Sequence, residues 1–470
     1  MRDSELIEKK KRLSDSAKAS DGTPSPAACS KQLKQTQIHQ SLQGQPPNKF
    51  DGDHPKQKLI TEKIAHMICK DLQPYTIVED PGFRAVIKAA EPKYVMPSRK
   101  TFSAEIIPKL YTDTYTAVKS EVQLASCLAF TTDAWTSRAN NGYLSYTVHF
   151  LTANFEMRNY CLAVENVDES HTAANLANSL SEQTNAWTSD SQRAAEIKIA
   201  VVSDNAANVQ AAISKVPSCI SVKCFDHTLQ LAINDAVQHC TELKTCIQKA
   251  KSITTHFKHS SQNTKKLMER EKQLGLQQLK LKQECITRWN SKFDMLERLV
   301  FVKDAVSSVV ASVKNVQGLS ASEWEVAEEY VNVFKPFKVL TATMSSATSP
   351  TISMVIPELN KLKHILQNDC GLEATCLPTL REDLVSAIDH RWPQYEANRL
   401  YAISTYVDPR YKDCGFSADS CAAFAHSLVL SEMTLMSSRQ SRAVTSSLSS
   451  STTSAISGMC SCTNVCHALK

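Results

Sequence analysis

The chain has little glycine and no long apolar segment. Ten glycines occur in 470 residues and aromatic residues make up 7%, so we expect a helix-rich body with few tight glycine turns. No apolar run approaches the ~20 residues that span a bilayer, and the N-terminus contains no signal-peptide core. A soluble, intracellular protein that does not associate with a membrane is therefore expected.

Paired zinc ligands are missing from the cysteine pattern. No two of the 16 cysteines are separated by two residues, a spacing common in zinc fingers. A disulfide framework is not expected in a long chain without a secretory signal. One dense cluster contains Cys460, Cys462, Cys466 and His467, but its spacing matches no common zinc module. We interpret it as part of a serine-rich end without fixed structure.

Positively charged residues outnumber negatively charged ones mainly near the N-terminus. The formal net charge is +5, and most of the excess lies before Leu59. The basic run from Lys9 to Arg12 could bind phosphates or direct nuclear import, although a solvated helix end is the commoner role of so short a run. Bulk charge alone therefore does not predict nucleic-acid binding.

The hydrophobic pattern changes several times along the chain. Apolar residues recur at helical spacing from Leu59 onward. Three strand-like runs, Ala125–Thr131, Tyr143–Leu151 and Asn159–Val167, then predict an antiparallel meander. Helix and strand patterns alternate as far as Cys224, and long amphipathic helical patterns follow. Strands followed by β-α-β alternation predict an α/β fold with a mixed sheet and helices on its faces.

These changes define six segments. We predict a disordered basic region (1–57), a small helical domain (58–122), a core containing the sheet (123–235), a large all-helical insertion (236–400), a partial return toward the core (401–430) and a disordered serine-rich tail (431–470).

Two aspartates follow apolar strand-like runs. Asp133 lies in Phe130–Ser137, and Asp204 follows Ile199–Ser203. Carboxylates on neighbouring strands can share divalent metal ions that clamp the two oxygens of a phosphodiester exchange. From spacing alone, a pair of turn or cap residues is the commoner interpretation. A third acid is usually needed, and nothing in the local sequence of Glu325, Glu358 or Asp389 marks it for that role.

Three further groups could serve the same chemistry. Cys224 and His227 lie three residues apart, but two ligands do not complete a zinc site. Arg288 offers a phosphate-binding guanidinium beside Trp289, whose ring could stack on an unpaired base or pack between helices. Cations at Lys258, Lys265 and Lys266, with His256 and His259 nearby, could hold a phosphate backbone or form a solvated helix face.

In combination, these motifs resemble those of the hAT transposase superfamily, in particular domesticated transposases that carry a BED-type zinc finger. The resemblance covers about 350 residues and follows the family's order. It is carried by Ile64–Phe83, Pro92–Arg99, Asp133–Ser137, Ser203–Asn208, Cys224–His227, Phe257–Ser260, Thr287–Ser291 and Val407–Lys412.

The resemblance implies an RNase H-like fold interrupted by a helical insertion and preceded by a small helical domain. It implies that Asp133 and Asp204 are the ancestral acids for Mg²⁺ or Mn²⁺ and that Trp289 is the base-stacking tryptophan. It also places Trp135, Asn205 and the Cys224–His227 element near the active site.

The sequence also departs from the family pattern. No finger-like Cys/His pattern precedes Leu59, so zinc is expected only for a BED finger outside this chain, and the dimerisation segment with the third catalytic Glu is not found. We therefore expect a nuclear DNA-associated or transcription-related scaffold without transposition activity. The alternatives are an active metal-dependent transposase or nuclease, and a protein-interaction module of the SUMO-conjugation or transcriptional-regulator type. DNA, a second copy and chromatin or transcription proteins are the expected partners.

Overall fold

The computed structural model describes residues 48–167, 171–188, 199–217, 219–285, 288–314, 316–346, 349–368 and 376–449. The chain divides into two compact units, with the boundary between Thr116 and Ala117. No helix in the described ranges is long and apolar enough to cross a membrane. The predicted disorder of 1–47 and 450–470, and the cluster around Cys460, lie outside the described residues.

The first unit is the predicted small helical domain. Its core contains Ile64, Ile68, Val78 and Phe102, all nearly inaccessible to solvent. Its elements are α3 (Pro55–Lys70), η2 (Tyr75–Glu79), α4 (Pro81–Ala90), α5 (Arg99–Thr101), η3 (Phe102–Ile106) and the beginning of α6 (Ile107–Leu124).

Both predicted boundaries of this unit were wrong by a few residues. Helix α3 begins at Pro55, inside the segment 1–57 that was expected to be disordered, because a proline with its fixed φ begins a helix readily. His54 Nδ1 also accepts a hydrogen bond from the Lys56 amide at 3.1 Å. At the other end, Val118 and Val122 already pack in the core of the sheet, so the unit ends before residue 122.

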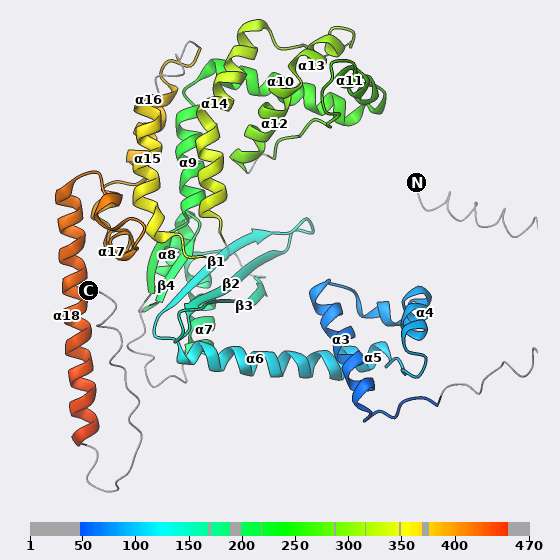
Figure 1. Ribbon diagram of the computed structural model, residues 1–470, viewed down its shortest axis with the longest axis vertical. Helices are drawn as coiled ribbons and strands as arrows, with labels where there is room; N and C mark the ends of the chain where they lie inside the picture. Colours follow the sequence, from blue (N-terminus) through cyan, green and yellow to red (C-terminus); the bar gives the residue numbers. More distant parts are fainter. Residues whose placement is uncertain are drawn as a thin grey trace, which may run out of the picture. The chain divides into compact units, whose positions relative to one another are not determined.

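The second unit contains a five-stranded mixed sheet of RNase H-like type (Figure 1). Strand order is β3-β2-β1-β4-β5; β1 pairs antiparallel with β2 and parallel with β4. The fold class and the meander predicted from the sequence are thereby confirmed. The strands are β1 (Leu128–Thr136), β2 (Gly142–Leu151), β3 (Met157–Asn166), β4 (Ile199–Ser203) and β5 (Cys219–Lys223).

The two faces of the sheet differ in burial. On one face Leu128, Phe130, Tyr146 and Val148 are buried against the end of α6, α7 (Ala173–Thr188) and α8 (Ala207–Ile213). Because successive strand residues point to opposite faces, Thr131 and its neighbours at odd positions of β1 lie on the other face, where they are half-buried or exposed. The core of the sheet therefore occupies only one of its faces.

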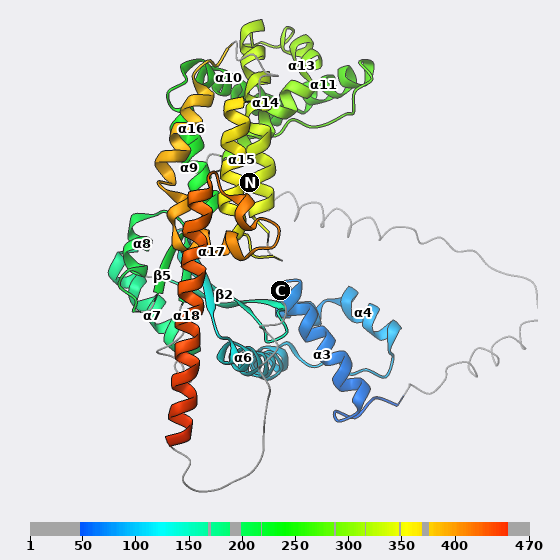
Figure 2. The same cartoon turned by 60° about the vertical axis from the view of Figure 1, so that its left-hand side comes forward.

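A body of helices follows the sheet. Its core includes Leu243, Phe293, Phe337 and Leu384, all fully buried, and α9, α14, α15 and α16 lie side by side in Figures 1 and 2. The helices are α9 (Phe225–Val237), α10 (Thr241–His259), α11 (Ser261–Gln273), α12 (Trp289–Phe301), α13 (Lys303–Val310), α14 (Ala321–Met344), η4 (Ile352–Met354), α15 (Val355–Asn368), α16 (Leu380–Arg391), η5 (Tyr395–Ala397), α17 (Arg399–Val407) and η6 (Lys412–Gly415).

The helical body is longer than the predicted insertion 236–400. Leu229 and Ile233 of α9 are buried in its core, as are Ala402 and Ala425. The predicted boundary at 235 was therefore too late, since the apolar face of α9 packs on helices. The segment 401–430, expected to return toward the sheet, thus contributes Ala402 and Ala425 to the helical core.

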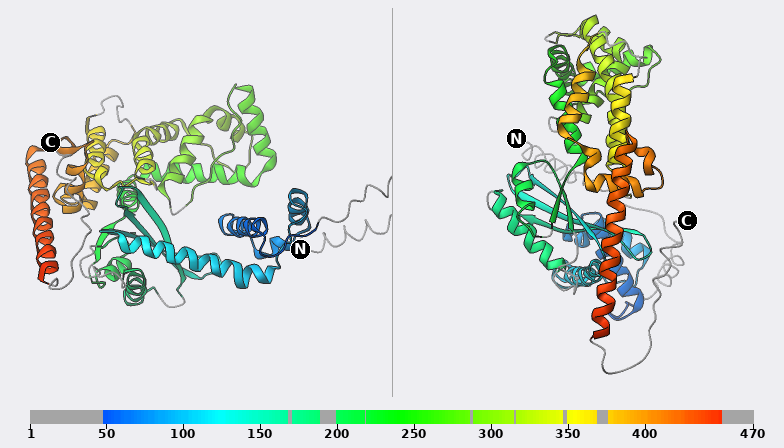
Figure 3. Two further views of the ribbon diagram at one scale, coloured as in Figure 1. Left: turned by 60° about the horizontal axis from the view of Figure 1, so that its bottom comes forward. Right: turned by 90° about the vertical axis from the view of Figure 1, so that its left-hand side faces the viewer.

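The predicted disorder from 431 onward was wrong as far as residue 449. Helix α18 (Asp419–Ser449) continues through this segment and stands at one side of the helical body (Figure 3). No glycine or proline interrupts it, so its backbone hydrogen bonds can continue. Leu430, Met433 and Met436 are nevertheless more than half exposed, which explains why hydrophobic periodicity did not predict the helix.

Candidate functional site

Strand register brings the two predicted acids to the same level. Thr131 of β1 pairs with Val202 of β4 in parallel orientation, and Asp133 and Asp204 each follow two residues later. Neighbouring parallel strands place such residues side by side at their carboxyl ends, where α/β sheets commonly bind ligands. Asp133 is exposed and lies inside β1, which continues to Thr136.

A cleft of about 820 Å³ opens at this edge of the sheet. It is lined by residues of β1, by the end of β4, by the beginnings of α9 and α12, and by the end of α14. Predicted site residues that line it are Asp133, Asp204, Cys224, His227, Arg288 and Trp289. Residues distant in the sequence therefore converge on one cleft.

Asp204 and Asn205 are oriented by local hydrogen bonds. The Asp204 carboxylate accepts from the Ala206 amide at 3.2 Å, while the Asn205 side-chain amide donates to the Thr228 hydroxyl at 3.0 Å. The Thr228 hydroxyl lies 2.7 Å from the Cys224 carbonyl oxygen. Asn205 thus joins the loop after β4 to α9 and positions the acid beside it.

Asp226 is a third acid of the cleft that the sequence reasoning did not select. Its Oδ2 accepts a hydrogen bond from the Ser345 hydroxyl at 2.7 Å, and its buried Oδ1 has no partner among the described residues. Burial raises the pKa of this carboxyl, and the bond from Ser345 opposes the shift. Its position directly between Cys224 and His227 was the only available signal.

The Cys224–His227 element lies at the junction of β5 and α9. The Cys224 amide donates to the Ser203 carbonyl at 2.7 Å, which extends the pairing between β4 and β5. Burial raises the pKa of the Cys224 thiol, so the thiolate that binds metals is disfavoured there. This element therefore holds the cleft together and is a poor zinc site.

The donors fit a divalent cation only through two carboxylates. Among the described residues, no group of three or more His, Cys, Asp and Glu side chains is arranged to hold a metal ion. Mg²⁺ is often held by one or two carboxylates and completes its shell with water or phosphate oxygens. Asp133 and Asp204 suit that arrangement, and the unpaired Asp226 oxygen adds a further acceptor to the same cleft.

Trp289, predicted to stack on a base, lines the cleft but is largely buried in this structure. Its side chain is 4% exposed, and its ring contacts Phe293, Phe334 and Phe337 with centroid distances between 6.1 and 6.4 Å. In this conformation the ring packs within the aromatic cluster beside the cleft. Arg288, the N-cap residue of α12, is exposed and forms no ion pair with a described residue.

The other predicted residues lie outside the lining of the cleft. Lys258 ends α10, while Lys265 and Lys266 follow in α11; all three are exposed and lack ion-pair partners in the described ranges. Trp135 is 39% exposed at the end of β1 and stacks on Tyr143. Of the predicted cations, Arg288 lines the cleft, and the three lysines lie on α10 and α11.

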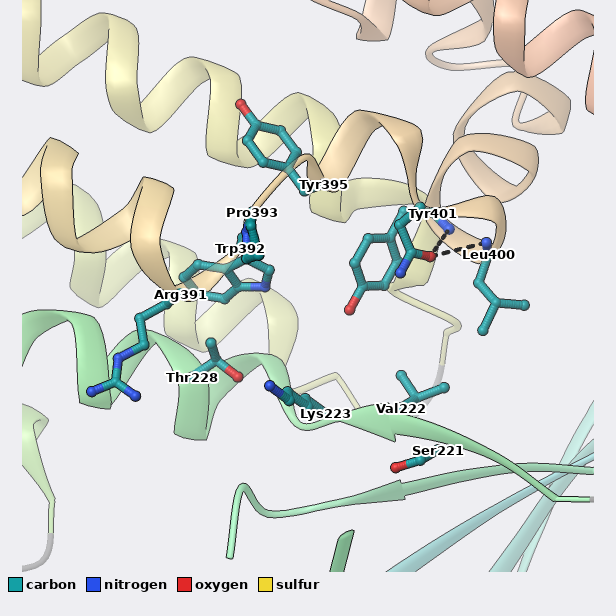
Figure 4. A pocket seen from close by; sticks show the side chains of 11 residues that line it. Ser221, Val222, Lys223, Thr228, Arg391, Trp392, Pro393, Tyr395, Leu400 and Tyr401 are labelled. Atoms are coloured by element: carbon teal, nitrogen blue, oxygen red, sulfur yellow. Dashed lines mark hydrogen bonds between the residues drawn. The ribbon is translucent and has the colours of Figure 1, made fainter. Parts of the chain in front are cut away.

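A smaller pocket of about 240 Å³ lies beside edge strand β5 (Figure 4). Lys223, Arg391, Trp392 and Tyr401 are among its lining residues. The Arg391 guanidinium already forms two hydrogen bonds with Asp235, at 2.6 and 2.9 Å, which join α16 to α9. No residue that the sequence marked for chemistry lines this pocket, so the larger cleft is the candidate site.

Comparison with known proteins agrees with this architecture. A model of the ZBED1 RNase-like domain matches residues 131–231, and a model of the ZBED1 RNase-like helical domain matches residues 222–333. Zinc finger BED domain-containing protein 4 of Homo sapiens is 27% identical over 83% of the chain, and the Zea mays protein named "Putative AC transposase" is 22% identical over 80%. The chain belongs to the hAT-derived BED-type zinc finger family.

The overlap of the two family models falls at a structural junction. Residues 222–231 contain the end of β5 and the beginning of α9, where the apolar core changes from the sheet to the helical body. A further relative, named "Putative transcriptional regulator tpeD" in Talaromyces stipitatus, is 24% identical over 76% of the chain. The chain spans 34% of the human relative, 49% of the maize relative and 45% of the fungal relative.

Proposed function

We propose that this transposase-derived chain is a nuclear DNA-associated scaffold with a transcription-related role and without strand-transfer activity. The carrying observation is a set of exposed cations on α10, on α11 and at the start of α12, together with a cleft in which only two acids share one register. Arg288, Lys258, Lys265 and Lys266 form no ion pair within the described ranges. Such cations bind phosphates and release counterions, which makes the binding salt-dependent.

The proposed partners follow from the same chemistry and from the relatives. A DNA backbone suits the cations, and Mg²⁺ or Mn²⁺ would be held by Asp133 and Asp204. The name of the fungal relative, "Putative transcriptional regulator tpeD", supports nuclear localisation and association with transcription or chromatin proteins. Zinc is proposed only for a BED finger of the kind that the human relative's name states, and self-association is proposed as a family property.

The test is DNA binding by the full chain as a function of salt. Neutralising Lys258, Lys265 and Lys266 together to Gln should weaken binding of a duplex and lower the slope of log K against log salt by up to about 3, since each phosphate contact contributes roughly 0.9. Asp133→Asn and Asp204→Asn should leave this binding unchanged or stronger. Equal affinity and slope in the triple variant would remove the proposal.

A matched control carries the same change in charge at another surface. Three exposed lysines supply it: Lys314 in the loop after α13, Lys335 on α14 and Lys361 on α15. Changing all three to Gln should reduce the slope of log K against log salt much less. A similar loss in both triple variants would mean that net charge, rather than the α10–α11 surface, governs binding.

One observation favours a second candidate, a metal-dependent nuclease. Asp226 lines the same cleft as Asp133 and Asp204 and has a buried oxygen without a hydrogen-bond partner. A third carboxylate on the same cleft is the acid that two-metal phosphoryl chemistry commonly adds to such a pair, although the three side chains are not grouped around one metal position in this structure. This candidate predicts nicking of supercoiled DNA in Mg²⁺ or Mn²⁺ that disappears in Asp133→Asn and Asp204→Asn. Nicking that survives both changes would come from a contaminant and would exclude it.

A further inference from the structure

Strand β5 forms an edge of the sheet that no described strand covers. It is last in the order β3-β2-β1-β4-β5 and pairs with β4 on its inner side. The Cys224 amide, just beyond β5, donates to the Ser203 carbonyl of β4 at 2.7 Å, and the hydrogen bonds of a parallel ladder come from alternate residues of a strand. Val222 therefore bonds toward β4, while the N–H and C=O groups of Ser221 and Lys223 point outward from the sheet.

The pocket of about 240 Å³ in Figure 4 lies beside this edge. The last three residues of β5 line one part of it, and residues at and after the end of α16 line another. The two hydrogen bonds from Arg391 to Asp235 hold the end of α16 in place, and the Trp392 ring packs on Phe225 with a centroid distance of 5.2 Å. The pocket is thus formed before a ligand arrives, which lowers the entropy cost of binding.

The polar side chains that remain free on this lining can all donate a hydrogen bond. No aspartate or glutamate is among the described residues of the lining. Lys223 is exposed and forms no ion pair with a described residue, and the Trp392 ring N–H and the Tyr401 hydroxyl have no hydrogen-bond partner in the same ranges. Burial raises the pKa of the Tyr401 hydroxyl, which keeps it protonated. In Figure 4 this hydroxyl points toward β5.

Side-chain oxygens on the lining are already engaged. The Asn398 side-chain oxygen accepts from the Leu400 and Tyr401 amides at 3.0 and 3.3 Å, and the Tyr395 hydroxyl donates to Asn360. A ligand group in this pocket must therefore supply acceptors to the free donors. A carboxylate does so, since it is anionic and offers two acceptor oxygens.

The outward backbone of β5 distinguishes a peptide from a nucleic acid. An extended peptide offers alternating N–H and C=O groups, which pair with an open sheet edge. A phosphate backbone has no N–H groups, so it would leave the Ser221 and Lys223 carbonyl oxygens unpaired beside its own negative charge. A peptide strand along β5 would also place alternate side chains on the face of Val222, where they can enter the pocket.

We propose that β5 and this pocket bind an extended acidic peptide of a partner protein. The peptide adds a strand to the sheet and places a carboxylate side chain between Lys223, Trp392 and Tyr401. Backbone pairing supplies affinity, and the pocket supplies specificity for the acidic side chain. The site shares no residue with the cations proposed to bind DNA, so the inference is independent of the DNA-associated function and adds a protein partner to it.

The test measures the anisotropy of fluorescently labelled peptides with the full chain. The probe is a short Thr- and Val-rich peptide, which favours extended structure, with a central Glu; matched probes carry Gln or Lys there. Wild-type protein should bind the Glu probe roughly 10- to 100-fold more tightly than the Gln probe, the range for charge-assisted hydrogen bonds, and should bind the Lys probe most weakly. Hydrogen exchange of residues 219–223 should slow with the Glu probe. Equal affinities, or no binding of any probe, would overturn the inference.

Variants of the lining test the carboxylate site. Lys223→Gln should remove most of the preference for Glu over Gln, and Tyr401→Phe, which loses only a hydroxyl, should reduce that preference by about 2- to 10-fold. Lys215→Gln is the matched control, because Lys215 is an exposed lysine just after α8; it should keep the preference. A preference that survives Lys223→Gln, or that Lys215→Gln abolishes equally, would exclude the pocket.

Two changes at one residue test strand addition. Ser221→Pro removes an outward N–H group but no hydrogen bond to β4, so it should weaken the Glu and Gln probes alike, by at least about 10-fold. Ser221→Ala loses the hydroxyl bond to Gln210 at 2.6 Å but keeps the N–H group, and it should bind as wild type does. Equal binding by the two variants would rule out strand addition. Thermal melts verify folding, and if the proline variant does not fold, the hydrogen exchange of residues 219–223 in wild-type protein decides.

This inference and the DNA-associated function fail separately. The triple Gln variant of Lys258, Lys265 and Lys266 should bind the Glu probe as wild type does; a loss there would mean that the peptide binds the α10–α11 surface by charge alone, which contradicts the inference. Binding of a labelled oligonucleotide that depends on Lys223 would assign the pocket to phosphate and also contradict it. Absence of salt-sensitive DNA binding would remove the scaffold function and leave the peptide site standing.

Discussion

Two tryptophans beside the same cleft lie in regions of opposite character. Trp289 is enclosed by three phenylalanines of α12 and α14 and is 4% exposed, whereas Trp135 has one aromatic neighbour and is 39% exposed. The first contributes to the free energy of unfolding and the second is available to a ligand. A motif therefore does not determine what its aromatic residue does, because burial decides it.

The largest expected effect is on stability. Trp289→Ala should lower the free energy of unfolding by about 3–5 kcal/mol, since it opens a cavity in the aromatic cluster. Trp135→Ala should lower it by about 1 kcal/mol, because it loses one stacked pair at the surface. Denaturant unfolding of both variants measures the difference. Similar losses would contradict the contrast, and Trp289→Phe provides a milder variant that retains a ring in the cluster.

The second expected effect concerns the close packing beneath the β1–β2 hairpin. A Cβ at Gly142, the first residue of β2, would lie 2.6 Å from His171 Nε2 and 3.0 Å from the Val167 carbonyl oxygen. Gly142→Ala should therefore lower the free energy of unfolding by about 1–3 kcal/mol. Gly82→Ala in α4, where a Cβ meets nothing within 4 Å, should be neutral or stabilising. Equal effects in thermal or denaturant unfolding would show that Gly142 tolerates a side chain.

The smallest expected effect distinguishes two carboxylates by the sign of their pH dependence. Hydrogen bonds from Arg410 hold the pKa of Asp408 below its usual range, so this carboxylate stabilises the fold above about pH 4 and loses that contribution as pH falls. Asp408→Asn should thus lower the free energy of unfolding at pH 7 by less than about 1 kcal/mol, with a deficit that shrinks in acid.

Asp226 should behave in the opposite way. Burial raises its pKa, so its contribution to stability is fully present below about pH 4 and decreases as pH rises through the raised pKa. Asp226→Asn should therefore increase the free energy of unfolding at neutral pH and change it little in acid. Denaturant unfolding of both variants at several pH values checks the signs; the same sign for both would show that the cleft does not desolvate Asp226.

The strand regions were predictable because their local patterns agree with the fold. Runs such as Tyr143–Leu151 alternate in burial as observed for β2, and apolar runs before Asp133 and Asp204 correspond to β1 and β4. The sequence does not show that Asp133 and Asp204 lie side by side, since their alignment depends on the pairing of Thr131 with Val202. The sequence reasoning thus found the acids, while strand register brought them together.

Other features depend on contacts between distant segments. Trp289 is buried partly by Phe334 and Phe337, which a local reading of Arg288–Trp289 does not include. Asp226 could not be recognised as a cleft residue from the sequence, because its contact with Ser345 joins α9 to the distant end of α14. Helix α18 was missed because its exposed apolar residues give no clear amphipathic pattern, although its sequence contains no residue that breaks a helix.

Side chains along β1 alternate between a buried face and an open face, and substitutions on the two faces have different consequences. Phe130 is fully buried and faces α7 and α8, while Asp133 and Trp135 lie on the open side. Replacing an acid therefore removes no packing, so selection on folding alone would not preserve it. Residues on the open side can therefore change without loss of the fold, because the buried side alone keeps the architecture intact.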